Sequence, residues 1–83
     1  MSQAATRIEI RIRDRVGVVS EVTREITALG IPITAHEAHV SHDVRGQAVS
    51  VFRAELRLDE AELERLRHRC SRIKGFLRFS KRP

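Results

Sequence analysis

The chain has 83 residues with three Phe and no other aromatic residue, so it can form one domain whose core is mainly aliphatic. Sixteen basic and eleven acidic residues give a net charge of +5, which permits contact with a nucleic acid or an acidic surface without requiring it. A single cysteine excludes an intramolecular disulfide, and neither a signal peptide nor a membrane-spanning run is present, so we expect a cytoplasmic protein.

The first part of the chain predicts a strand followed by a helix. Residues 6–13 alternate apolar and charged side chains, which is typical of a strand with one buried and one solvated face. Apolar residues then recur at helical spacing across residues 18–29. Gly30 follows directly and is placed to end this helix in a left-handed conformation.

Two further strands are predicted in the middle of the chain. Residues 31–40 alternate again, but the alternation changes phase, which predicts a bulge near His36 and Glu37. Residues 43–46 have the composition of a turn. Residues 48–58 alternate once more, and pairing them with the first strand would create a ladder of Arg and Glu on the solvated face.

The last part predicts a second helix and a short strand. Asp59 and Glu62 have the spacing of a capping box, so the helix is expected to begin there. Cys70 lies on the apolar stripe of this helix and is expected to be a buried small hydrophobic residue. Gly75 is placed to end the helix, and residues 76–79 predict a strand.

The predicted order βαββαβ indicates an α+β fold, a ferredoxin-like sandwich with a four-stranded antiparallel sheet and two helices on one face. We expect residues 1–5 to be a disordered lead-in, residues 6–80 to form the domain, and residues 81–83 to be a basic tail. Many unrelated functions use this fold, so the function has to be argued from particular residues.

Catalytic and metal chemistry are not indicated. The phosphate-binding loop of acylphosphatases and the C-x-x-C motif of heavy-metal carriers are both absent. His36, His39 and His42 recur every third residue, which on a strand puts His39 on the opposite face from the other two. Three ligands of that kind do not converge on one ion, so we expect no metal and no other cofactor.

RNA binding is an alternative, because RNA-recognition motifs have the same order of strands and helices. Residues 45–52, which begin with Arg45-Gly46, also match part of the sequence signature of their central strand. The positions that stack on bases hold Gln47 and Val49, which have no aromatic face. Contact with the backbone of RNA or of the ribosome, through arginines such as Arg7, Arg11 and Arg53, remains open.

The turn Asp14-Arg15-Val16-Gly17, a helix ending in Leu29-Gly30, and Ile31-Pro32-Ile33 opening the next strand resemble an ACT domain. ACT domains are small non-catalytic regulatory modules that usually bind amino acids, often as homodimers with the effector at the interface. The resemblance implies a binding site with two parts. It assigns Asp14, Arg15, Val16, Gly17, Val18 and Val19 to the turn and helix start, and Gly30, Ile31 and Pro32 to the other side.

The chemistry of these residues suits an amino acid. Free backbone N–H groups at residues 17–19 can bind a carboxylate, and Asp14 can bind an ammonium group. The alternative is that Asp14 and Gly17 only shape a tight turn. Within the family, Ile73-Lys74-Gly75-Phe76 near the end resembles the C-terminal ACT domain of Rel/Spo-type GTP pyrophosphokinases of the stringent response, although Pro32 stands where Asn is common there.

Overall fold

The computed structural model describes residues 5–83; residues 1–4 of the expected lead-in lie outside the described residues. The elements are β1 (Ala5–Arg13), α1 (Val18–Ala28), β2 (Ile33–His42), β3 (Ala48–Arg57), α2 (Glu60–Ser71) and β4 (Phe76–Lys81). The predicted order of strands and helices is therefore confirmed. Ala5 is already the first residue of β1, and β4 extends as far as Lys81.

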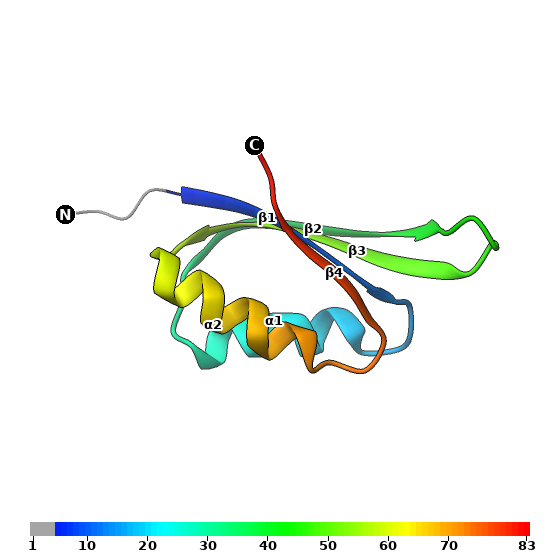
Figure 1. The fold of residues 1–83 in the computed structure, drawn as a ribbon, viewed down its shortest axis with the longest axis horizontal. Coiled ribbons are helices and arrows are strands. Elements are labelled where there is room, and N and C mark those ends of the chain that lie inside the picture. Colours follow the sequence, from blue (N-terminus) through cyan, green and yellow to red (C-terminus); the bar gives the residue numbers. More distant parts are fainter. Residues whose placement is uncertain (1–4) are drawn as a thin grey trace.

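The four strands form one antiparallel sheet in the order β2-β3-β1-β4, and both helices lie on the same side of it (Figure 1). This arrangement is the ferredoxin-like sandwich that the sequence predicts. The hairpin of β2 and β3 extends beyond the helix layer (Figure 1), and most of β2 is exposed. The sheet has two free edges, β2 and β4, and one face without helices, which we call the open face.

The core lies between the sheet and the helices, and it is largely aliphatic as expected. Ile8, Ile10 and Ile12 of β1 are buried there against Val22 and Ile26 of α1. Cys70 is also buried, and loss of solvation, followed by the nearby Glu25 charge, raises the pKa of its thiol to about 12. Cys70 is thus a packing residue, as the sequence predicts.

The start of α2 and the end of α1 lie at the signals read from the sequence, whereas α2 ends at Ser71, so the prediction that Gly75 ends this helix is wrong. The Asp59 carboxylate accepts the Glu62 N–H at 2.8 Å, and the Glu62 carboxylate accepts the Asp59 N–H at 2.9 Å, which completes the capping box. At the end of α1, Gly30 has a φ of 69°. Its N–H donates to Thr27 C=O at 2.9 Å while the next N–H, of Ile31, donates to the carbonyl of Ile26 at 3.3 Å.

The bulge expected near His36 and Glu37 lies earlier, between Ile33 and Ala35, so that prediction is wrong in position. Thr34 is the extra residue, and its hydroxyl donates to Glu55 C=O at 3.0 Å, which gives that carbonyl a partner beside the irregularity. The displaced register puts Ala35 on the open face.

Candidate ligand-binding site

The turn between β1 and α1 is held by the backbone of Gly17. This residue is the N-cap of α1 with a φ of 83°, and its carbonyl accepts the Glu21 N–H at 3.0 Å. The Val18 N–H is not free, because it donates to Arg15 C=O at 3.2 Å. Within the described chain, the N–H groups of Gly17, Val19 and Ser20 have no acceptor, so of the three donors that the sequence suggested at residues 17–19 only that of Val18 is engaged.

Two side chains of the turn project into solvent. Asp14 is exposed, and its carboxylate has no hydrogen bond or ion pair among residues 5–83, while its backbone N–H donates to Ala48 C=O at 3.1 Å. Val16 is fully exposed. An exposed acidic side chain, an exposed apolar side chain and open backbone donors therefore occur within one short segment at the start of α1.

Arg15 has a role that the sequence did not indicate. Its guanidinium forms an ion pair with Glu21 of α1 and donates to Lys74 C=O at 3.2 Å. The neighbouring Arg13 N–H donates to Gly75 C=O at 2.9 Å. These bonds tie the β1–α1 turn to the α2–β4 turn, and a sequence gives no signal for a contact between segments so far apart along the chain.

The structure places the second part of the predicted site at the other end of α1. Ile31 is buried in the core, and the carbonyl of the exposed Pro32 accepts the Arg57 N–H at 3.2 Å. Because α1 has eleven residues, roughly 16 Å of helix separate residues 30–32 from the Gly17 turn. A single copy of the chain therefore does not bring the two parts together.

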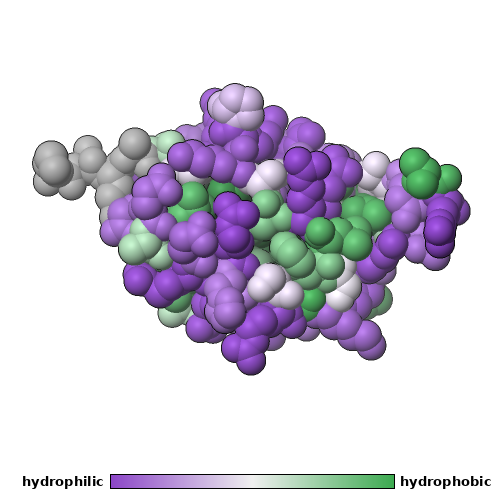
Figure 2. Space-filling model, viewed as in Figure 1, coloured by the Kyte–Doolittle hydropathy of each residue, from purple (hydrophilic) through white to green (hydrophobic). Residues whose placement is uncertain are grey.

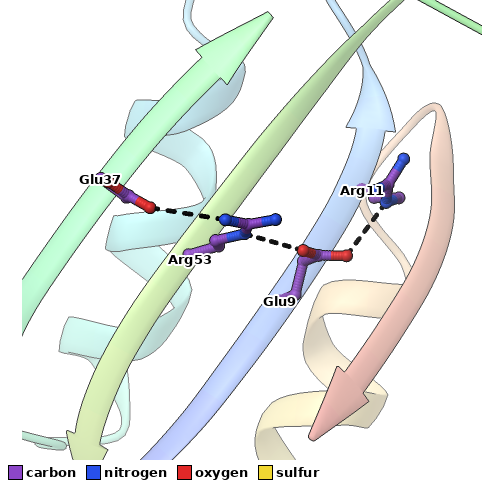
Figure 3. A network of polar contacts seen from close by, with 4 residues as sticks. All are labelled: Glu9, Arg11, Glu37 and Arg53. Carbon is purple, nitrogen blue, oxygen red and sulfur yellow. Dashed lines mark hydrogen bonds and ion pairs between the residues drawn. The ribbon is translucent and has the colours of Figure 1, made fainter. Parts of the chain in front are cut away.

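The open face carries the Arg and Glu ladder that the sequence predicts. Figure 3 shows Glu9 of β1 between two arginines, with Arg53 Nε at 2.9 Å and Arg11 Nε at 3.0 Å from its carboxylate oxygens. Arg53 also reaches Glu37 of β2 at 3.8 Å. Partial burial raises the pKa of the Glu9 carboxyl, but the hydrogen bonds from Arg53 and Arg11 outweigh it, so the net pKa lies below the ordinary value.

This network bears on the RNA alternative. Arg11 and Arg53, two of the three arginines considered for RNA, have their charge offset by Glu9. All three Phe side chains belong to the core or pack against it, so none of them is available on the open face for a base to stack on. A shallow hollow of about 260 Å³ near Arg7, His36 and Arg53 is lined by Glu37 and Glu55 as well, which disfavours a polyanion.

Two solved enzymes share this fold. They are formyltetrahydrofolate deformylases from Pseudomonas putida KT2440 and Pseudomonas syringae pv. tomato str. DC3000, with TM-scores of 0.65 and 0.63. Each is 24% identical to this chain and matches 96% and 93% of it, respectively. The chain spans under a third of their length, 29% and 27%. This likeness supports the ACT-like fold and gives no support to the specific link with stringent-response enzymes.

No protein-family model matches the chain, and no curated protein matches it. Among residues 5–83, no helix combines the length and apolar character needed to span a membrane. In the same part of the chain, no three His, Cys, Asp or Glu side chains are grouped so that they could hold a metal ion.

Proposed function

We propose that this chain is a non-catalytic ACT-type regulatory domain that binds a small amino acid at the turn between β1 and α1. The observation that carries the proposal is the left-handed Gly17, which turns the chain so that α1 starts with open N–H groups at Val19 and Ser20. The exposed and unpaired Asp14 lies in the same turn. The resemblance of this segment to ACT domains and the fold shared with two solved enzymes support the proposal.

The two ends of an amino acid suit the two kinds of group in the turn. The ligand carboxylate accepts hydrogen bonds from the Val19 and Ser20 N–H groups, where the helix dipole favours a negative charge. The ligand ammonium pairs with the Asp14 carboxylate. Val16 supplies apolar contact for a small aliphatic side chain.

We further propose that a second copy of the chain completes the site. Residues 30–32 lie too far from Gly17 within one copy, yet they lead directly into β2, which is a free edge of the sheet. Pairing of the β2 edges from two copies would place the 30–32 segment of each copy beside its neighbour. The functional unit in this proposal is a homodimer.

The parent protein is a separate proposal. The residues near the end of the chain favour a stringent-response GTP pyrophosphokinase, whereas two of the solved structures that share this fold are formyltetrahydrofolate deformylases. The coding sequence that adjoins this segment in its genome distinguishes them, because the two parents would contribute different enzyme domains.

The test is a thermal-unfolding screen of the chain against each of the twenty amino acids. A ligand that binds the native state at a hundredfold excess over its Kd adds about 2.7 kcal/mol to the free energy of unfolding. We expect a small aliphatic amino acid to raise Tm, and Asp14→Asn to abolish the rise because it removes the partner of the ammonium group.

The matched control is Glu64→Gln, which removes one exposed carboxylate from α2 and should leave the response intact. A screen in which no amino acid raises Tm would reject the proposed effector class. A response that persists in Asp14→Asn would reject the site.

A further inference from the structure

The β4 edge of the sheet is irregular at its start. Ile12 of β1 faces Phe76 while the preceding Arg11 faces Arg78, so Leu77 is an extra residue without a partner in β1. Leu77 keeps 43% of its surface exposed, which is high for a large apolar side chain beside the core. This bulge opens an apolar position at a free edge of the sheet.

The backbone of β4 also has groups available for pairing. The Arg82 N–H donates to Arg7 C=O at 2.7 Å, so the backbone groups of Arg82 point toward β1. Because the N–H and C=O groups of successive residues point alternately toward and away from the partner strand, those of Phe79 and Lys81 point toward the free edge. The side chain of Arg67 in α2 contacts this edge, but only weakly. Its guanidinium lies 5.0 Å from the centre of the Phe79 ring and donates to Phe79 C=O at 3.4 Å, which is a long bond.

The open-face side of β4 is positively charged. Arg78 lies directly opposite Arg11, and like charges in such a cross-strand pair destabilise the sheet. Arg82 lines the same hollow as Arg7. Among residues 5–83, the side chains of Arg78 and Arg82 have no ion-pair partner, so their charge is available to an acidic group from outside.

The helix side of β4 is partly apolar. A groove of about 420 Å³ lies between β4 and α2, where Phe76, Leu77 and Phe79 provide apolar surface. Its other lining residues are Glu64, Arg67, His68, Ser71 and Arg78. Figure 2 shows hydrophobic surface where β4 crosses in front of the sheet in Figure 1, with hydrophilic surface around it. One strand edge thus has cations on one side and a groove with apolar surface from Phe76, Leu77 and Phe79 on the other.

We propose that the β4 edge binds an extended segment of a partner protein in which acidic and apolar residues alternate. The segment adds a fifth strand to the sheet by pairing with the backbone of Phe79 and Lys81. Because side chains of a strand alternate between faces, its acidic residues meet Arg78 and Arg82 while its apolar residues enter the groove beside Leu77. This surface uses none of the residues of the proposed amino-acid site.

The positive charge of β4 favours this acidic peptide segment over a second copy of the chain as the binding partner. Antiparallel pairing of two β4 strands would bring Arg78, Lys81 and Arg82 of one copy against the same basic residues of the other. A nucleic acid would meet the positive charge but would leave the apolar groove unused, and the described surface offers it no stacking ring beside Arg78.

The test uses fluorescently labelled ten-residue peptides with proline at each end, one alternating Glu and Val and one alternating Lys and Val, and a single-stranded RNA of ten nucleotides. We expect the Glu-Val peptide to bind the full chain at least about tenfold more tightly than the Lys-Val peptide in fluorescence anisotropy. Binding should shift the amide NMR signals of Phe79 and Lys81 and leave those of the β2 edge unchanged.

Two double variants locate the interaction. Arg78→Glu with Arg82→Glu should weaken Glu-Val binding by about tenfold or more. Arg24→Glu with Arg72→Glu makes the same change in net charge on the helix side and should change binding less than about twofold, which is the level expected of a distant charge. Leu77→Asp should also abolish binding while CD shows that the fold remains.

Three outcomes would overturn the proposal. They are equal binding of both peptides, shifted signals on β2 instead of β4, and equal losses in the two double variants. Binding of the RNA without binding of the Glu-Val peptide would also reject it and would assign the basic edge to a nucleic acid.

Discussion

At the scale of single residues, the conformation of Gly17 determines the geometry of the candidate site. A Cβ atom at this position would meet no heavy atom within 4 Å apart from those of its chain neighbours, so the constraint comes from the backbone conformation. A left-handed conformation costs a residue with a Cβ roughly 1–2 kcal/mol, more for branched side chains and less for Asn. The turn at the start of α1 is therefore specified by one glycine.

We predict that Gly17→Val lowers the free energy of unfolding by about 2 kcal/mol or more, since the branched Val side chain tolerates a positive φ poorly. Gly17→Asn should lower it less. Urea denaturation followed by CD measures both values, and the far-UV spectrum should show that the core survives. If the Val variant keeps both its stability and its response to amino acids, the proposed role of this turn is wrong.

Glu9 gives a second prediction at this scale. Its pKa is lowered from 4.5 in the folded chain, so its ionised form contributes stability that is present above the unfolded pKa and is lost as the pH falls through the folded pKa. Glu9→Gln should therefore destabilise the chain at pH 7, by about 1 kcal/mol because the paired arginines are partly exposed.

The difference between Glu9→Gln and the unmodified chain should shrink as the pH falls below 4.5 and through the lower folded pKa of Glu9, because the protonated Glu9 side chain is then uncharged like Gln. Urea titrations at pH 7 and pH 3 measure it. A difference that stays constant with pH would show that packing, rather than the ion pairs in Figure 3, accounts for the effect of Glu9.

At the scale of elements, the sequence predicts well wherever local chemistry decides the outcome. Alternation in residues 6–13 and the pairing of Asp59 with Glu62 depend on close neighbours, and both were confirmed. The sequence analysis placed the bulge at Thr34 too late in the chain and gave no sign of the bulge at Leu77. A bulge depends on the register between two strands, which the sequence of one strand does not contain.

The candidate site was predictable only in part for the same reason. The left-handed Gly17 follows from the local sequence, but the engagement of Val18 N–H by Arg15 and the reach of Arg15 to Lys74 depend on backbone geometry and tertiary contact. The distance between the Gly17 turn and Pro32 follows from helix length, and it keeps the two parts of the predicted site apart within one copy.

The β2 edge provides a prediction about association. This strand is exposed, and Ala35 and Ala38 add little bulk to its two faces, so the edge is free to pair with another copy. Ala35→Lys with Ala38→Lys should convert the dimer to a monomer in sedimentation at high micromolar concentration.

Ala61→Lys with Ser71→Lys adds the same charge to exposed positions at the two ends of α2 and should leave the dimer intact. An unmodified chain that sediments only as a monomer would contradict the proposed association. Dissociation by both variants would indicate that charge, rather than the β2 edge, controls it.

At the scale of the whole molecule, a site that spans two copies connects ligand binding to assembly. An effector that contacts the Gly17 turn of one copy and residues 30–32 of another stabilises the dimer by mass action. We predict that the amino acid that raises Tm also lowers the dimer dissociation constant, and that Tm then depends on protein concentration. Sedimentation with and without the effector checks this, and an unchanged dissociation constant would place the site within one copy.

The bonds that join the β1–α1 turn to the α2–β4 turn have a thermodynamic consequence. Arg15 contacts Lys74 and Arg13 contacts Gly75, directly before the strand that we propose as the peptide edge. An effector that draws Arg15 away from its present partners would remove a hydrogen bond that fixes the turn before β4. Reciprocity then requires that a peptide on β4 alter the affinity for the effector by the same factor as the effector alters the affinity for the peptide.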